Sequence, residues 1–224
     1  MALLLCIDTA TEYAGVCLSN NNEILTFKES SDQKNHASFV QPAIKELVNN
    51  STPLKDIDAI AVVNGPGSYT GLRVGLATAK GLCYALNKPL LLLNTLEVIA
   101  RGAMRNFKEE NFLFCPMIDA RRMEVFTALY DSYLKVIMEP KAMILDESSF
   151  EELLKKNKIV FSGSGHNKLE NIINNNNAVF TKHHHNVEDV ASAASLAYEK
   201  KAFSNVAYSE PFYLKEFFTI SHNT

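Results

Sequence analysis

A glycine-rich segment over residues 64–73 has the residue types that could hold an anion. It follows an apolar run over residues 57–63 and precedes a stretch with the spacing of a helix. A strand, a glycine loop and a helix in this order present free backbone N–H groups and a positive helix end, which can bind phosphate. The segment lacks the Lys-Ser/Thr pair of a Walker loop and the spacing of the dinucleotide fingerprint. We therefore favour a tight turn that Ser68 or Thr70 caps before the helix.

Histidines are the second group with potential chemistry. His183, His184 and His185 are adjacent, but successive side chains of an extended chain point alternately, so the three cannot converge on one metal ion. We interpret them as an exposed loop. His36 lies near the start of a predicted helix, and the position four residues later, which would face the same side, is Val40. A lone histidine of this kind is typical of a surface or capping residue.

Composition and charge describe a folded protein from a reducing compartment. The chain has 224 residues, enough for one large domain or two small lobes. Its formal net charge is -3, without the basic excess of a protein that binds RNA by itself. Cys6, Cys17, Cys83 and Cys115 lack metal or redox spacing, and the N-terminus lacks a signal-peptide pattern. No apolar run approaches the about 20 residues that span a bilayer. We expect a soluble, cytoplasmic protein with no membrane contact.

The helix predicted over residues 71–86 is apolar around most of its circumference. Small residues recur at every fourth position, and larger apolar residues share a neighbouring face. The small residues are Gly71, Gly75 and Ala79, and the larger ones are Leu72, Leu76 and Cys83. Each glycine costs the helix about 1 kcal/mol relative to alanine, and close helix packing is one reason to accept that cost. We expect a helix–helix interface with another subunit. The alternative is burial under the chain's own second lobe or first helix.

The remaining elements alternate between strands and helices. Apolar runs predict strands over residues 3–7, 14–18, 23–28, 57–63, 90–93, 113–118, 125–130, 134–138, 159–161 and 212–214. Helical spacing predicts helices over residues 37–49, 96–104, 150–156 and 187–202 besides the one above. This order is that of an α/β protein with mixed strand directions. We place a lobe boundary near residue 106, giving lobes of residues 1–105 and 106–224, and allow the last segment to pack back on the first lobe.

Blocks spread along the sequence resemble the TsaB family. Residues 65–75, GPGSYTGLRVG, resemble the signature of that family, and residues 7–12, IDTATE, match its opening strand. Residues 116–126, PMIDARRMEVF, resemble a hairpin of its second lobe, and residues 162–165, SGSG, a glycine turn there. Residues 211–215, PFYLK, resemble its C-terminal element, with Lys where Arg is common. The blocks lie in order and cover nearly the whole chain, although residues 135–201 are weakly diagnostic.

The resemblance implies an actin-like ATPase fold, with two ribonuclease-H-like lobes that face a cleft. Members of this family work with a related catalytic subunit, TsaD, and an ATPase, TsaE. Together these proteins transfer a threonylcarbamoyl group from threonylcarbamoyl-AMP to N6 of the tRNA adenosine that follows the anticodon, position 37. The TsaB-like member is a non-catalytic scaffold, and tRNA is the substrate of the complex rather than a tight ligand of this chain.

The resemblance also places the partner contact on the two helices of the first lobe. The first of these helices adds Val40 and Ile44 to the expected interface. The same surface is expected to form a homodimer when the TsaD-like partner is absent.

The resemblance further indicates what this chain lacks. Relatives of this fold place a magnesium-linked carboxylate and a phosphate turn where Asp8 and Thr9 end the first strand, and Gly163 and Gly165 form a second glycine turn. The histidine pair and the second-lobe aspartate of a metal site have no counterpart here. We therefore expect a vestigial nucleotide cleft, no catalytic residue and no metal or cofactor in this chain, with ATP and metal in the partner subunits. The alternative is a stand-alone enzyme of this fold, either a small kinase or a glycoprotease-like metallopeptidase.

Overall fold

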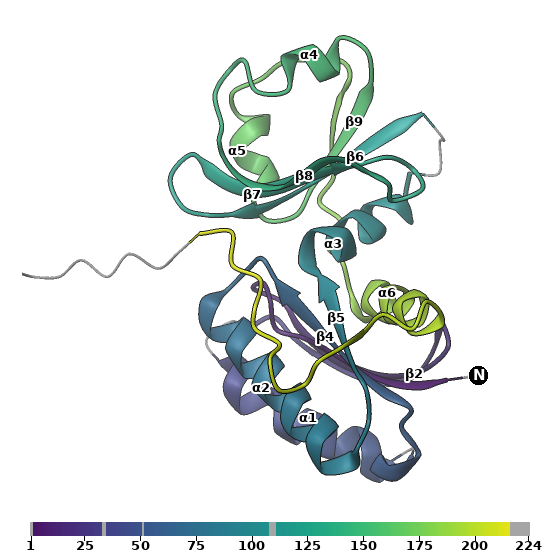
Figure 1. Cartoon of the computed structure of the whole chain (residues 1–224). Coiled ribbons are helices and arrows are strands. Elements are labelled where there is room, and N and C mark those ends of the chain that lie inside the picture. Colours follow the sequence, from purple (N-terminus) through teal and green to yellow (C-terminus); the bar gives the residue numbers. More distant parts are fainter. Residues whose placement is uncertain (1, 33–34, 51, 108–110, 216–224) are drawn as a thin grey trace, which may run out of the picture.

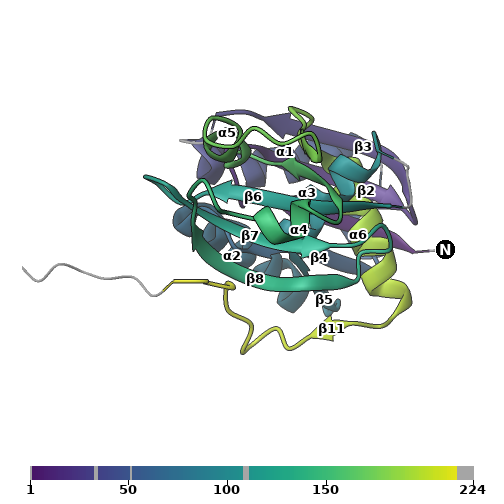
Figure 2. The ribbon, with the colours of Figure 1, turned by 90° about the horizontal axis from the view of Figure 1, so that it is seen from above.

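The molecule has two lobes, each built on one β-sheet, with a helix between them (Figure 1). The computed structural model describes residues 2–32, 35–50, 52–107 and 111–215. Seen from above, the second lobe lies over the first, and the last described residues run along one side of the molecule (Figure 2). Within the described ranges, no helix combines the length and the apolar character that a membrane crossing requires.

The first sheet has six strands in the order β11-β5-β4-β1-β2-β3. They are β1 (Leu3–Asp8), β2 (Ala14–Asn20), β3 (Glu23–Ser30), β4 (Ala59–Gly65), β5 (Leu90–Asn94) and β11 (Phe203–Ser204). β1 pairs antiparallel with β2 and parallel with β4, so the strand directions are mixed, as the sequence predicts.

The central strands have sequences that suit burial on both faces. In β1, Leu5 and Ile7 face one layer of the core, and Leu4 and Cys6 face the other. Every residue of β4 is buried. A strand covered on both faces has a continuous apolar run instead of an alternating one, which explains why these strands are easy to recognise in the sequence.

Helices cover both faces of the first sheet. α1 (His36–Asn50) and α2 (Tyr69–Leu86) pack on one face. α6 (Val187–Glu199) packs on the other, with Val98 of α3 (Thr95–Met104) beside it. A 3-10 turn, Leu54–Asp56, lies between α1 and β4. Because α6 comes from the end of the chain, the first lobe is assembled from two separate stretches of sequence.

The second sheet repeats the topology of the first. Its five strands follow the order β10-β9-β6-β7-β8, with the first strand again antiparallel to the second and parallel to the fourth. They are β6 (Phe112–Asp119), β7 (Glu124–Tyr130), β8 (Val136–Ile144), β9 (Lys158–Ser162) and β10 (Ala178–Phe180). α3 covers one face, and α4 (Glu151–Leu154) and α5 (His166–Glu170) lie on the other. This repeated order is the one expected for two ribonuclease-H-like lobes.

Several expectations about single elements need correction. The strand predicted over residues 212–214 is absent, and the last described strand is β11. α5, β10 and β11 were not predicted. α1 begins at His36, one residue before the predicted start, and Pro42 lies inside the helix.

The end of the chain packs back on the first lobe. The second sheet uses residues 112–180, but α6 and the described residues after it contact the first lobe. The boundary near residue 106 stays a prediction, and that prediction allows the last segment to pack back on the first lobe.

Candidate functional site

The glycine-rich loop before α2 is a capped turn that packs on its own chain. Ser68 is the N-cap, and its hydroxyl accepts a hydrogen bond from the backbone N–H of Gly71 at 3.3 Å, as the sequence predicts. The backbone N–H of Ser68 itself donates to the carbonyl of Ala10, at 2.7 Å, in the turn after β1. These N–H groups serve the chain's own structure, which supports a packing role for the loop over an anion site.

The first two glycines of α2 allow the end of β1 to approach the helix. A Cβ atom at Gly71 would lie 2.0 Å from the carbonyl oxygen of Thr9, and one at Gly75 would lie 2.5 Å from its Oγ1. The Thr9 hydroxyl donates to the carbonyl of Gly71 at 2.7 Å, inside the buried contact. The small-residue groove therefore accommodates β1 of the same lobe.

This packing corrects the interface that the helix pattern suggested. The seven residues expected to meet a partner are all buried between the two helices and the first sheet. They are Val40, Ile44, Leu72, Gly75, Leu76, Ala79 and Cys83. The alternative reading, burial within the chain, applies to these side chains, because the sheet and α1 cover the apolar side of α2.

A different side of the two helices remains exposed. Gln41 and Lys45 of α1 and Ala77, Gly81 and Tyr84 of α2 are exposed, and we call these five residues the helical face. A groove of 500 Å³ runs between the helices there. Its lining consists of Gln41, Ile44, Lys45, Val48, Leu54, Ala77, Thr78, Gly81 and Leu82. A Cβ atom at Gly81 would meet nothing within 4 Å, so this part of α2 has room for another molecule.

Asp8, which ends β1, is buried and engaged by a histidine from far along the chain. Its Oδ1 accepts the backbone N–H of Ala10 at 2.9 Å, and its Oδ2 lies 2.9 Å from Nε2 of His185. The expectation of an exposed histidine triplet is correct for His183 and His184 but wrong for His185, which is buried. Burial by itself lowers the pKa of His185, but the hydrogen bond to Asp8 and nearby negative charges raise the pKa above its usual value.

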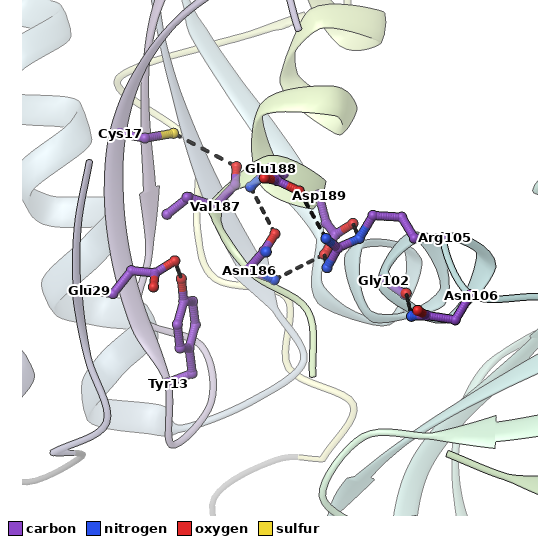
Figure 3. Close-up of polar contacts among 10 residues, drawn as sticks. All are labelled: Tyr13, Cys17, Glu29, Gly102, Arg105, Asn106, Asn186, Val187, Glu188 and Asp189. Carbon is purple, nitrogen blue, oxygen red and sulfur yellow. Dashed lines mark hydrogen bonds and ion pairs between the residues drawn. The ribbon is translucent and has the colours of Figure 1, made fainter. Parts of the chain in front are cut away.

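The residues that follow His185 are fixed at the start of α6, where Asn186, Glu188 and Asp189 lie beside Arg105 (Figure 3). Asn186 and Asp189 form a capping box, in which the Asp189 carboxylate accepts the backbone N–H of Asn186 at 2.9 Å. Arg105, just after α3, bonds Asp189 and Glu188, each at 2.9 Å. Burial raises the pKa of Asp189, although the Asn186 N–H and the Arg105 charge act in the opposite direction. This network holds the start of α6, where the chain comes back from the second lobe to the first, against α3.

The second glycine turn, like the first, packs on a neighbouring strand. The backbone N–H of Gly165 donates to the carbonyl of Met117 at 2.9 Å. Gly163 has a φ of 84°, and a Cβ atom there would lie 2.5 Å from the same carbonyl oxygen. The turn is thereby attached to the end of β6.

A cavity of 620 Å³ lies between the lobes, beside the four residues of the expected nucleotide cleft. Its lining consists of Ala10, Thr11, Glu12, Gly67, Ser68, Tyr69, Thr70, Ile118, Asp119, Ala120, Arg121, Phe126 and Ser164. Asp8, Thr9, Gly163 and Gly165 are not part of this lining, and both oxygens of Asp8 already have partners. The four residues therefore do not fit a magnesium-bound nucleotide in this arrangement.

The side chains that could bind a metal are spread out over the described residues. Within them, no group of three or more His, Cys, Asp or Glu side chains is placed to hold a metal ion. His36 is buried at the first turn of α1, which corrects the expectation of a surface residue. Neither of its ring nitrogens has a hydrogen-bond partner within the described part of the chain. Val40, one turn later, is a core residue.

Comparison with known proteins identifies the family. A family model described as TsaD, tRNA N6-adenosine threonylcarbamoyltransferase, matches residues 28–216. The tRNA threonylcarbamoyladenosine biosynthesis protein TsaB of Bacillus subtilis is 31% identical over 208 residues, 89% of this chain and 88% of that protein. The chain belongs to the TsaB family.

A solved structure and a second sequence match extend the comparison of this TsaB-family chain. YeaZ from Pseudomonas aeruginosa superposes with a TM-score of 0.82 at 25% identity, covering 96% of this chain and 100% of that one. This match and the repeated sheet topology confirm the actin-like ATPase fold. A tRNA N6-adenosine threonylcarbamoyltransferase of Bartonella henselae is 39% identical over 108 residues, 41% of this TsaB-family chain and 30% of the transferase. The chain is thus related in sequence to enzymes of that name.

Proposed function

We propose that this chain acts in the biosynthesis of threonylcarbamoyladenosine in tRNA as a non-catalytic subunit. Its membership of the TsaB family supports the pathway. In the proposal, it binds a TsaD-like catalytic subunit and works with a TsaE-like ATPase. These partners supply the ATP and metal chemistry for transfer of the threonylcarbamoyl group from threonylcarbamoyl-AMP to N6 of the tRNA adenosine at position 37.

The observation that carries the scaffold role is the contrast between the engaged Asp8 and the free helical face. Asp8 has both carboxylate oxygens bonded within the chain. The helical face, in contrast, offers a groove of 500 Å³ and a glycine with open space above it. Partner binding through the two helices therefore stays our proposal, but through the exposed residues beside the groove. Of the seven residues expected at the contact, Ile44 alone lines this groove. The same face would form a homodimer when the catalytic subunit is absent.

Gly81 provides the test of the proposed contact. Gly81→Arg places a long cation over the groove without disturbing the core, because nothing lies within 4 Å of the added Cβ atom. We expect it to abolish binding to the purified TsaD-like subunit in calorimetry, whereas the control Gly81→Ala binds as the unchanged chain does. Gly75→Leu is unsuitable because its side chain would enter the core beside Thr9. Unchanged binding by Gly81→Arg would refute the helical face as the contact.

The pathway assignment has its own test. Deletion of the gene followed by nucleoside analysis of bulk tRNA should show loss of threonylcarbamoyladenosine. If the amount of the modified nucleoside is unchanged, the pathway assignment is wrong, because a required subunit cannot be absent without effect.

The alternative, a stand-alone enzyme of this fold, draws support from the cavity of 620 Å³ between the lobes. Calorimetry of the isolated chain with ATP and magnesium separates the two functions. Stoichiometric, tight binding would favour the enzyme. We expect no binding, since the carboxylate at the end of β1 is already bonded to His185.

A further inference from the structure

The last described residues, 205–215, form a segment that we call the C-terminal strap. It runs beside α2 and then turns toward the second lobe (Figure 1). Lys80 of α2 holds its first part, since the Lys80 ammonium donates to the carbonyls of Ala207 at 3.1 Å and Ser209 at 2.9 Å. The strap is therefore attached to the helix by specific hydrogen bonds, although it has no regular secondary structure.

The middle of the strap contacts the end of β4, where the glycine-rich segment begins. The side-chain amide of Asn64 donates to the carbonyl of Glu210 at 3.0 Å, and the backbone N–H of Phe212 donates to the carbonyl of Asn64 at 2.8 Å. Gly65 has a φ of 122°, and a Cβ atom there would lie 2.4 Å from the carbonyl oxygen of Phe212. A larger residue at position 65 would displace the strap. The segment that resembles a phosphate site therefore positions the C-terminal strap.

The end of the strap is fixed on both lobes. The Arg73 guanidinium donates from Nε to the Tyr213 hydroxyl at 3.1 Å and lies 4.0 Å from the centre of the Tyr69 ring. The Tyr69 and Tyr213 rings are 5.3 Å apart. Lys215 forms an ion pair of 2.7 Å with Glu124 at the start of β7. With these contacts, the strap is a preorganised surface, which lowers the entropic cost of binding a partner.

The strap and the groove lie on opposite flanks of the exposed side of α2. At 100° per residue, Arg73 and Lys80, which hold the strap, fall on one flank. Thr78 and Leu82, which line the groove against α1, fall on the other. The exposed Gly81 lies between the two flanks. The helical face and the strap are therefore neighbouring parts of one surface.

The residue types along this surface are those that concentrate in protein interfaces. Tyr84 of α2 is 87% exposed, and Tyr208 of the strap is 85% exposed. Phe212 and Tyr213 are also exposed aromatic residues. Arg73 and Lys80 are the charged residues of α2, and the helix has no acidic residue. Tyrosine, phenylalanine and arginine are enriched in the cores of interfaces and carry much of their binding energy.

We infer that the C-terminal strap, with Tyr208 as its exposed contact, forms part of the docking surface for the TsaD-like catalytic subunit. This inference rests on the proposed function. We identify the partner as the TsaD-like subunit because the strap is continuous with the helical face. A subunit that covers Gly81 and Tyr84 also reaches the flank of α2 that carries the strap.

Calorimetry of the full chain with the purified TsaD-like subunit tests the inference. Tyr208→Ala should raise the dissociation constant by about tenfold or more, which is the effect of losing an aromatic residue that carries much of the binding energy. The matched control is Tyr133→Ala, which removes a tyrosine that is 78% exposed at the turn after β7 in the second lobe. We expect this variant to change the constant by less than about twofold. Both tyrosines are exposed enough that their loss leaves the core unchanged.

The Gly81 and Tyr208 variants test the helical face and the strap separately. If Gly81→Arg abolishes binding while Tyr208→Ala and Tyr133→Ala bind equally well, the strap inference is overturned and the proposed function stands. If Gly81→Arg also binds normally, the proposed contact fails. A Tyr208→Ala variant that loses self-association in light scattering but keeps its affinity for the catalytic subunit would assign the strap to a second copy of the chain and likewise overturn the inference.

Discussion

Alanine substitutions at Gly75 and Gly81 should have opposite effects on stability. Both glycines lie inside α2, where replacement by alanine favours the helix by about 1 kcal/mol. At Gly81 the new methyl group has open space, so we expect the full gain. At Gly75 it would lie 2.5 Å from Oγ1 of Thr9 and 3.3 Å from Cγ2 of Val62, both in the core.

The cost at Gly75 follows from the groups that must move. Forcing a methyl group into a filled core costs about 1–3 kcal/mol. Displacing Thr9 also weakens its 2.7 Å hydrogen bond to Gly71 and leaves a buried hydroxyl unsatisfied, which costs about 1–3 kcal/mol. After subtraction of the helix gain, we expect Gly75→Ala to lose about 1–5 kcal/mol, so the two variants should differ by about 2–6 kcal/mol.

Urea unfolding followed by circular dichroism measures this difference. Each variant is compared with the unchanged chain at one pH, and the midpoints and slopes are fitted separately. The helix propensity and the unfolded-state effect of the methyl group are the same for both variants, so they cancel in the comparison. Equal stability of Gly75→Ala and Gly81→Ala would show that β1 does not approach α2 as closely as the structure places it.

Three further predictions concern ionisable groups. His185→Ala leaves Asp8 without its cationic partner and should cost about 3 kcal/mol near pH 6. The folded-state pKa of His185 is raised above its unfolded value, so the stabilisation is present below about pH 6.5 and decreases as the pH rises through the folded pKa; a loss that stays constant up to pH 9 in chemical unfolding would contradict this. Arg105→Met should lower the free energy of unfolding by about 1–2 kcal/mol at pH 7, a modest loss because the guanidinium is 39% exposed. The loss should be smaller near pH 4, where Asp189 takes up a proton. Equal losses at both pH values in thermal unfolding would disprove the coupling between Arg105 and Asp189. Burial raises the pKa of Cys115 to about 12, so an aromatic disulfide reagent should modify this thiol only after urea unfolds the chain, and fast modification of the native protein would contradict the placement.

Local patterns in the sequence were sufficient to predict most of the elements. β1 and β4 have continuous apolar runs because they are covered on both faces. Ser68 could be recognised as a cap because it precedes a helix and follows glycines, and the structure confirms this role. Such signals come from residues that are neighbours along the chain, so they can be recognised in a single sequence.

The identity of the surface that covers a helix was not predictable in this way. The spacing of Gly71, Gly75 and Ala79 shows that something packs closely on α2, but it is equally compatible with a strand of the same lobe and with another subunit. Gly81 gives no periodic signal, and its exposure depends on where α1 and the strap lie. Whether a strand or another subunit covers the helix depends on packing between residues that are far apart in the sequence. Local patterns in a single sequence do not reveal such packing.

The buried pair of Asp8 and His185 shows the same limit. The two residues are 177 positions apart, and the triplet of histidines has the composition of an exposed loop. One local signal was available, because the Asn186 cap and Asp189 mark the start of α6 immediately after His185. Residues next to a buried helix start are often buried themselves, so the third histidine differed from the first two. The false strand over residues 212–214 has a different cause. The backbone N–H of Phe212 bonds to Asn64 at the end of β4, but the aromatic segment does not become a strand of the sheet.

The two lobes differ in the order in which their parts leave the ribosome. The second sheet draws on residues 112–180 without interruption, so all of its strands are available before α6 is made. The first lobe begins at residue 3 but receives α6, β11 and the strap only from residues 187–215. Until then the face of its sheet that carries Leu4, Cys6 and Val63 has no helix α6 to cover it. A nascent chain or truncation product that stops before residue 187 therefore exposes a core surface, which makes it prone to aggregation and dependent on chaperones.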